Sequence, residues 1–238
     1  YTALIDRLSL LTVTAAAIHK WAASYDAALM RVSDARVPLL GHEDCRFILY
    51  RERFGGDEHV AIMIGEPSTD EPVLLRLHSA CLTGDLFASL RCDCGEQLHR
   101  SVEQLGRNGG GIILYLAQEG RGIGLANKLR AYQLQDQGLD TLDADQYLGF
   151  RNDERNYAVA CAMLHELGVT QVRLMTNNPA KIAAMRAGGI KVADRAPLNA
   201  TVNPHNARYI KTKQDRAGHL PEINDPEIND PKASDAAD

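Results

Sequence analysis

The densest chemistry in the sequence is a group of three cysteines, Cys81, Cys92 and Cys94, spaced C-x10-C-x-C within "HSACLTGDLFASLRCDCGEQL" (78–98). Zinc favours thiolate ligands, and a catalytic zinc site keeps three protein ligands and one open position. Cys92 and Cys94 can present both sulfur atoms on one side of an extended backbone, because alternate side chains share a face. The spacing favours a metal site over a disulfide framework or ordinary buried residues.

A closed structural site with four ligands is the rival interpretation, with His78 or His99 as the fourth ligand. The other two cysteines, Cys45 and Cys161, are expected in the core. The paired cysteines of the C-x-C motif are poorly placed to bridge each other. We therefore expect a reduced chain and a cytoplasmic location.

A second motif, "QEGRGIG" (118–124), is a glycine-rich turn that follows an apolar run. Such turns expose backbone N–H groups to anions, and Arg121 could add bidentate phosphate contacts. Most glycine turns only reverse the chain, but Arg76, Arg91 and Lys128 make a polyphosphate site plausible. Glu119 by itself is typical of a charge at a helix start.

The third motif, "NDERNY" (152–157), contains Asp153 and Arg155. By itself this pattern is typical of a helix start with Asp153 as the N-cap. Tyr132, in "LRAYQLQ", has the pattern of an aromatic residue on an amphipathic helix. "TNNPAK" (176–181) is typical of a turn that leads into a helix.

The elements that must position these residues give an α/β fold of mixed α+β character, with a β-rich first part followed by alternating helices and strands. Residues 1–36 are expected to form a helical N-terminal extension, residues 37–220 the main domain, and residues 221–238, with their PEIND repeat, a disordered acidic tail. Strands are expected at 45–53, 59–67, 72–80 and 190–198, and helices at 95–111, 125–138 and 155–169. The stretch 111–120 is expected to be a strand that runs into a glycine-rich turn, and 171–181 a strand that leads into a loop and a helix start.

The composition narrows the function classes. The chain has 238 residues, of which 45% are hydrophobic and 24% charged, which is enough for a substantial core. Its net charge of −5 argues against a general nucleic-acid surface. No apolar run approaches the ~18 residues of a membrane span, and the apolar stretch 8–18 lacks the features of a signal peptide. We expect neither nucleic acid nor membrane as a partner.

Four longer motifs carry a family resemblance: "RLHSACLTGDLFASLRCDCGEQL", "LYLAQEGRGIGLANKLRAYQLQDQGLDT", "LGFRNDERNYAVA" and "LGVTQVRLMTNNPAK". Together they resemble GTP cyclohydrolase II, in order, from about residue 37 to 220. The resemblance implies hydrolysis of GTP to 2,5-diamino-6-ribosylamino-4(3H)-pyrimidinone 5′-phosphate, formate and pyrophosphate, the first step of riboflavin biosynthesis. It also implies one Zn²⁺ on Cys81, Cys92 and Cys94, Mg²⁺ with the triphosphate, and a homodimer.

The resemblance assigns roles to individual residues. Tyr132 would assist ring opening near the zinc, Asp153 would accept a proton, and Arg155 would act at the α-phosphate. The family's arginine has been proposed as a nucleophile, but a guanidinium is a poor one, so we expect electrostatic stabilisation from Arg155. The implied nucleotide contacts are Arg76, Leu77, His78, Ser79, Ala80, Gln97, Glu119, Gly120, Arg121, Thr141, Thr176 and Lys181.

Two positions depart from the family pattern. Many members have glutamate where this chain has Ala80, and asparagine is more usual than Asp145. Ala80 supports one alternative, a paralogue on the same scaffold that acts on another nucleotide or pyrimidine. The other alternative is a zinc-stabilised nucleotide-binding module without catalysis, which predicts a closed site with four ligands.

Overall fold

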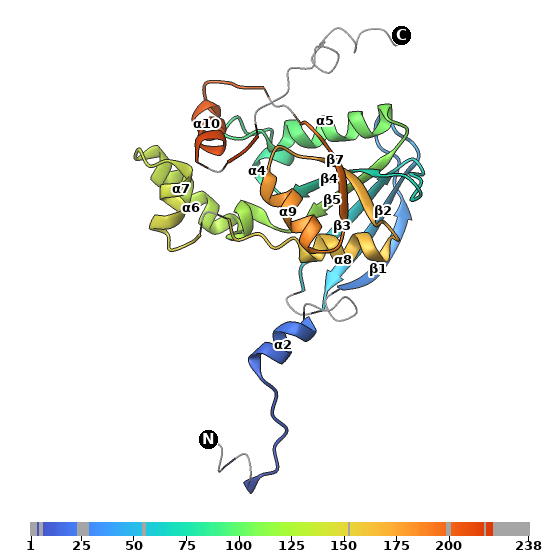
Figure 1. Ribbon diagram of the computed structural model, residues 1–238. Helices are drawn as coiled ribbons and strands as arrows, with labels where there is room; N and C mark the ends of the chain where they lie inside the picture. Colours follow the sequence, from blue (N-terminus) through green and yellow to red (C-terminus); the bar gives the residue numbers. More distant parts are fainter. Residues whose placement is uncertain are drawn as a thin grey trace.

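The computed structural model describes residues 4, 7–22, 29–53, 56–151, 153–198, 201–216 and 218–220. One seven-stranded sheet in the order β1-β2-β3-β5-β4-β6-β7 forms its centre (Figure 1). The strands are β1 (Leu29–Arg36), β2 (Cys45–Glu52), β3 (Glu58–Ile64), β4 (Val73–Ser79), β5 (Gly111–Leu116), β6 (Gln171–Met175) and β7 (Lys191–Ala196). The sheet with its helices confirms the mixed α/β fold expected from the sequence.

The helices come before, between and after the strands of the sheet. They are α2 (Ala15–Ala22), α4 (Leu82–Asp85), α5 (Cys94–Arg107), the 3-10 helix η1 (Glu119–Gly122), α6 (Gly124–Asp136), α7 (Thr141–Tyr147), α8 (Ala158–Glu166), α9 (Pro179–Ala187) and α10 (Ala207–Asp215). Within the described residues, no helix combines the length and apolar character needed to cross a membrane.

The sheet changes from antiparallel to parallel across its width. β1, β2, β3 and β5 pair in antiparallel fashion, whereas β5, β4, β6 and β7 are parallel. Parallel strands are usually covered on both faces, and six of the seven residues of β4 are buried. Leu75 and Leu77 belong to a core cluster with the side chains of α8, while Leu74 packs in a second cluster with Leu105 of α5. Helices therefore cover both faces of the parallel half.

The expectation that residues 1–36 form a helical extension is wrong for residues 29–36. Residues 29–36 form β1, which pairs with β2 from Leu29↔Glu52 to Arg36↔Arg46. Only α2, at Ala15–Ala22, is a helix of several turns among the described residues of this region, and it projects away from the sheet in Figure 1. The sheet thus begins at residue 29 and not after residue 36. The acidic tail, 221–238, lies outside the described residues.

Candidate active site

The three cysteines meet at one point although they come from two loops. Cys81 precedes α4, Cys92 lies in the loop after it, and Cys94 is the first residue of α5. Their sulfur atoms lie within 4.8 Å of one another, and those of Cys81 and Cys92 are 3.7 Å apart. A tetrahedral zinc with Zn–S bonds of about 2.3 Å needs sulfur atoms about 3.8 Å apart. The donor set therefore fits a zinc ion.

The alternatives considered for these cysteines are not supported by the structure. All five cysteines are free thiols, so no disulfide framework forms, and Cys45 and Cys161 are buried as expected. Among the described residues, the metal-ligand group contains the three sulfur atoms alone. Of the two histidines proposed as a fourth ligand, His78 hydrogen-bonds to Asp85 and His99 to a carbonyl of its own helix.

The thiols also have the electrostatics of a cation site. The pKa of Cys81 is lowered, because Cys92 and Cys94 donate to its sulfur and the ammonium of Lys128 lies 3.1 Å from it. The pKa of Cys92 is raised to about 11, first by its hydrogen bond to Cys81. The protein alone thus favours one thiolate, and a divalent cation would be needed to hold three.

Gly84 and Asp85 of α4 hold the thiol group in shape. A Cβ atom on Gly84 would lie 2.9 Å from the Cys92 sulfur and 3.1 Å from the Cys81 sulfur, so only glycine fits. The Asp85 carboxylate accepts hydrogen bonds from the backbone N–H of Cys81 at 3.0 Å and from the hydroxyl of Tyr115 at 2.8 Å. Contacts of this kind fix the orientation of metal ligands.

Two buried cations, one on β4 and one on α9, line the same cavity as the three cysteines. Arg76 on β4 donates to the Gln97 side chain at 2.7 Å, and Lys181 on α9 donates to the Leu77 carbonyl at 2.7 Å. Neither cation forms an ion pair with a carboxylate in the described part of the chain. Burial lowers the pKa of Arg76 to about 10 and also lowers that of Lys181. Buried positive groups with neutral partners favour an anionic ligand.

The lysine is placed by a strong helix-start signal. Asn178 caps α9 by accepting a hydrogen bond from the backbone N–H of Ala180 at 2.9 Å, and Pro179 occupies the first helical position. Thr176, immediately after β6, is buried. The expected turn into a helix at 176–181 is therefore confirmed.

The glycine-rich turn brings its arginine into the cavity through unusual backbone angles. Gly120 and Arg121 have φ values of 62° and 61°, a conformation that is uncommon for a residue with a side chain. The Arg121 guanidinium lies 3.7 Å from the Asp145 carboxylate. Burial raises the pKa of Asp145 to about 6. Asp145 thus forms a long, weak ion pair with Arg121 of the turn.

Glu119 has more structural contacts than the sequence indicated. Its carboxylate accepts hydrogen bonds from the backbone N–H of Leu82 at 2.6 Å and from Lys128 at 2.8 Å. Lys128 also contacts Cys81. The Glu119–Lys128 pair therefore connects the glycine-rich turn to the thiol group.

Asp153 and Arg155 form a bidentate pair. The Arg155 Nε and terminal nitrogen donate to the two carboxylate oxygens of Asp153 at 2.8 and 2.6 Å. The pKa of Asp153 is lowered despite its burial, because Arg155 donates to it, and the pKa of Arg155 is raised. The N-cap interpretation of Asp153 is wrong, since the following helix α8 is capped at Tyr157.

Tyr132 lies on α6, beneath two cations. The Arg91 guanidinium is 4.9 Å and the Lys128 ammonium 5.7 Å from its ring centroid. Burial raises the pKa of Tyr132 to about 12, so its hydroxyl stays protonated near neutrality. Thr141 begins α7, which Asp140 caps.

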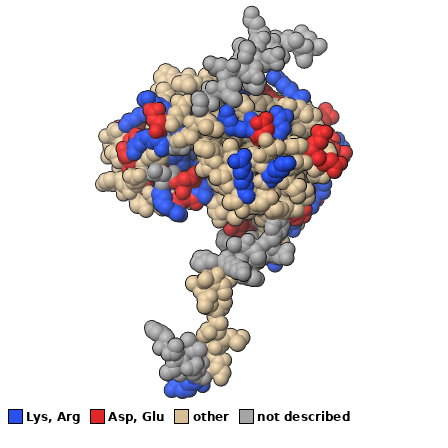
Figure 2. Space-filling view, viewed as in Figure 1, with Lys and Arg blue, Asp and Glu red and all other residues tan. Residues whose placement is uncertain are grey.

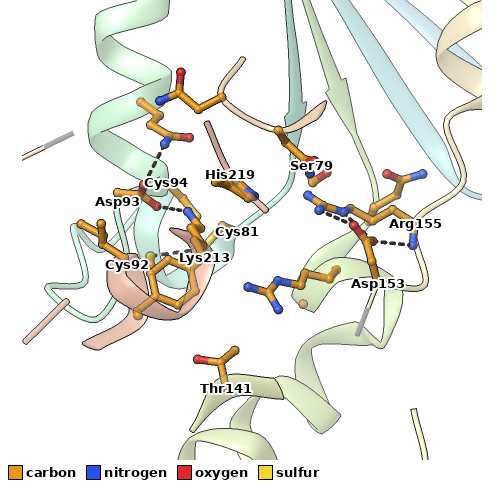
Figure 3. Close-up of a pocket in the computed structure, with 18 of the residues that line it drawn as sticks. Ser79, Cys81, Cys92, Asp93, Cys94, Thr141, Asp153, Arg155, Lys213 and His219 are labelled. Atoms are coloured by element: carbon orange, nitrogen blue, oxygen red, sulfur yellow. Dashed lines mark hydrogen bonds and ion pairs between the residues drawn. The ribbon is translucent and has the colours of Figure 1, made fainter. Parts of the chain in front are cut away.

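One cavity of about 320 Å³ collects these groups (Figure 3). The site residues expected from the sequence line it with two exceptions: Leu77, whose side chain is in the core, and Arg91, which pairs with Asp136 instead of facing the cavity. Four buried polar atoms of lining residues have no hydrogen-bond partner within the described part of the chain, namely Arg76 Nε, His78 Nδ1, Ser79 Oγ and Gln118 Oε1. Unsatisfied buried polar atoms of this kind favour a polar ligand.

The cavity also contains residues that were not expected to face it, namely Asp93, Tyr209, Lys213, Arg216 and His219. Asp93 lies between Cys92 and Cys94 in the sequence, and this position alone could have indicated that it faces the cavity. The other four come from the segment 201–220, which carried no recognised motif. On the face drawn in Figure 2, basic and acidic side chains are interspersed rather than gathered in one basic surface.

Comparison with known proteins agrees with this geometry. The family model for GTP cyclohydrolase II matches residues 30–197. The chain is 55% identical over 192 residues to GTP cyclohydrolase-2 of Azospirillum brasilense, which covers 81% of this chain and 50% of that protein. It is 54% identical over 165 residues to GTP cyclohydrolase-2 of Pseudomonas putida (strain W619), covering 69% of this chain and 80% of the relative.

A third relative is the riboflavin biosynthesis protein RibBA of Phocaeicola vulgatus, 48% identical over 179 residues, or 75% of this chain and 44% of RibBA. The chain thus spans about half the length of the first curated relatives it matches. The match to the family model covers most of the sheet and the whole cysteine group, together with the Asp153–Arg155 pair. This chain belongs to the GTP cyclohydrolase II family.

Proposed function

We propose that this chain hydrolyses GTP to 2,5-diamino-6-ribosylamino-4(3H)-pyrimidinone 5′-phosphate, formate and pyrophosphate, as the first step of riboflavin biosynthesis. The observation that carries the proposal is that a three-thiol metal group and buried cations line the same cavity. The reaction needs both, because it opens the guanine ring and also cleaves a phosphoanhydride bond. Family membership supports the same activity.

The metal half of the proposal rests on Cys81, Cys92 and Cys94 as ligands of one zinc ion. When bound, zinc would supply Lewis-acid activation of water at the imidazole ring of the guanine. Three protein ligands leave an open position, which favours catalysis over a closed structural site. Tyr132 would donate a proton to the ring nitrogen that is released, because its raised pKa keeps the hydroxyl protonated.

The phosphate half rests on the cations of the cavity. Arg155 would stabilise the charge that develops at the α-phosphate, and Asp153 holds its guanidinium in one orientation through two hydrogen bonds. The lowered pKa of Asp153 makes it a weak base, so orientation of Arg155 is its first role and proton acceptance its second. Mg²⁺ would accompany the triphosphate.

The nucleotide contacts proposed here follow the lining of the cavity. Arg76 and Lys181 supply buried positive charge, and the backbone turn at Gly120 and Arg121 exposes N–H groups. The remaining contacts are His78, Ser79, Ala80, Gln97, Glu119, Thr141 and Thr176. Leu77 would contribute only through its backbone, whose carbonyl accepts from Lys181.

The cellular location and the oligomeric state are part of the same proposal. Three free thiols in one cluster persist in a reducing compartment such as the cytoplasm, which we propose as the location. A homodimer is proposed on family resemblance alone. Ala80, which lines the cavity where many members have glutamate, supports the second candidate, a paralogue that acts on another nucleotide.

The deciding experiment is mass spectrometry of the products after the zinc-loaded protein is incubated with GTP and Mg²⁺. We expect equal amounts of formate and pyrophosphate together with the pyrimidine product. Release of pyrophosphate without formate, or turnover of another nucleotide in preference to GTP, would contradict the proposal. Parallel incubations with ATP, ITP and XTP test the paralogue alternative.

A further inference from the structure

Several residues of the segment 201–220 line the cavity although the segment lies beyond the family match, which ends at residue 197. The segment contains α10 and the turn that follows it (Figure 1). Its side chains Tyr209, Lys213 and His219 line the cavity together with the residues of the family motifs. The segment is therefore part of the site by position, and the question is what it contributes.

Hydrogen bonds attach the segment to three separate walls of the cavity. The Thr201 backbone N–H donates to the carboxylate of Glu96 on α5 at 2.8 Å. Arg216 bonds to two carboxylates at the start of α7. The Leu220 backbone N–H donates to the Asn177 carbonyl, after β6, at 2.8 Å. Because the segment is held at three points, the side chains that it directs into the cavity have defined positions.

Lys213 is the side chain that connects the segment to the metal loop. Its ammonium donates to the Asp93 carboxylate at 2.7 Å and lies 4.3 Å from the ring centroid of Tyr209. Asp93 in turn accepts from Gln97 at 2.7 Å, and Gln97 accepts from Arg76. An ammonium has three N–H donors, so the Asp93 bond leaves Lys213 donors for a ligand in the cavity.

His219 faces the cations of the cavity from the end of the segment. Its ring makes no hydrogen bond among the described residues, and Figure 3 shows it between the cysteine group and the Asp153–Arg155 pair. Four cations from four parts of the fold act on it: Lys213 of α10, Arg121 of η1, Lys181 of α9 and Arg155 before α8. Burial, followed by these cations, lowers the pKa of His219 to about 3. A polyanion bound among them would reverse this field and favour the imidazolium.

We infer that residues 201–220 are a working part of the substrate site, in which Lys213 and His219 contact the phosphate chain of the nucleotide. The identification of this nucleotide as GTP rests on the proposed function, whereas the phosphate contact itself does not. The buried Arg76 and Lys181 line the same cavity and have no carboxylate partner among the described residues. Lys213 adds its ammonium to this positive lining, and His219 adds an imidazole that becomes cationic only when a polyanion is bound.

Binding of inorganic tripolyphosphate to the zinc-loaded full chain tests the inference, because this probe has the phosphate chain without the base. Isothermal titration calorimetry would compare wild type with Lys213→Gln, His219→Gln and a matched control, Lys211→Gln. Lys211 is on the same helix, 76% exposed, and paired with Asp215. One charge-assisted hydrogen bond corresponds to roughly tenfold or more in affinity. We expect at least that loss for Lys213→Gln, a smaller loss for His219→Gln, and less than a twofold change for the control.

Two further readouts separate this inference from the proposed function. Zinc content and circular dichroism should match wild type in both variants, and their KM for GTP should rise more than their kcat falls. Equal tripolyphosphate affinity in Lys213→Gln, His219→Gln and Lys211→Gln would overturn the inference even if GTP is turned over. Lack of GTP turnover by wild type, with tripolyphosphate binding still dependent on Lys213, would overturn the proposed function and support the inference.

Discussion

Asp85 and Cys81 hold each other through a pair of reciprocal hydrogen bonds. The Asp85 backbone N–H donates to the Cys81 carbonyl at 2.7 Å, and the Cys81 backbone N–H donates to the Asp85 carboxylate at 3.0 Å. The same carboxylate accepts from Tyr115 and His78. One buried side chain thus fixes the first cysteine of the metal group and a histidine of the cavity.

Asp85→Asn should weaken zinc binding without removing a ligand. The amide keeps one acceptor oxygen but places two donors against the groups that now donate to the carboxylate. Loss of such a supporting contact typically lowers metal affinity about 10–100-fold. Competition with a chromogenic chelator would measure it, with the exposed Asp70→Asn as control. Identical zinc release from the two variants would contradict the role given to Asp85.

Gly84→Ala should distort the metal group by crowding alone. The new Cβ would lie 2.9 Å from the Cys92 sulfur and 3.1 Å from the Cβ of Cys94, so the loop must move. We expect reduced zinc content by elemental analysis. We also expect a smaller loss of melting temperature on addition of a chelator than in wild type, because less bound zinc remains to be removed. Full zinc occupancy with an unchanged chelator effect would show that the loop adapts freely.

Cys92→Ser should separate the two halves of the proposed reaction. The substitution removes one thiolate ligand, so zinc and formate release should be lost. Pyrophosphate release should persist, because the cations that we propose bind the phosphates are untouched. Separate assays for formate and pyrophosphate check this. A variant that releases formate at the wild-type rate would refute the metal assignment.

Arg155→Ala should have the opposite effect. Loss of the guanidinium removes the donor that we propose stabilises the α-phosphate, and removal of one such preorganised donor costs about 100-fold or more in kcat. Zinc content should be unchanged, since Arg155 contacts Asp153 and not the thiols. Pyrophosphate release at the normal rate would rule out the role assigned to Arg155.

The parts of the fold that the sequence predicts well are those with a strong local pattern. β4, an almost wholly buried strand, and α9, with its Asn178 cap and Pro179, lie where expected. β1 was missed for a physical reason. Seven of its eight residues are exposed, so it has no alternation of apolar and polar residues. Its pairing with β2 holds it in place, and pairing between distant strands is not visible in a local pattern.

The site shows the same limit at the level of single side chains. The C-x-C motif brings its own sulfur atoms together, so spacing alone indicates a metal group. Lys213 and Asp93 form an ion pair at 2.7 Å although they are far apart in the chain. No local spacing encodes that contact, because it depends on how α10 returns across the cavity. The role of Asp153 likewise depended on where α8 begins, which is at Ala158.

Asp145→Asn should stabilise the protein in a pH-dependent manner. Burial raises the pKa of Asp145 from 3.8 to about 6. The folded state therefore holds this proton more tightly than the unfolded state, and the stabilisation is present below pH 3.8 and lost as the pH rises through 6. Asparagine mimics the neutral acid, so the variant avoids this loss, which amounts to about 1–3 kcal/mol.

Chemical denaturation across pH 4 to 8 would test this, because the gap in unfolding free energy between variant and wild type should widen up to about pH 6. About one pH unit higher the gap should level off, since Asp145 is then almost fully ionised in both states. Asp70→Asn, at an exposed position, should show a gap that does not change with pH in this way. A constant gap for Asp145→Asn over the whole range would mean that Arg121, 3.7 Å away, stabilises the carboxylate enough to offset its burial.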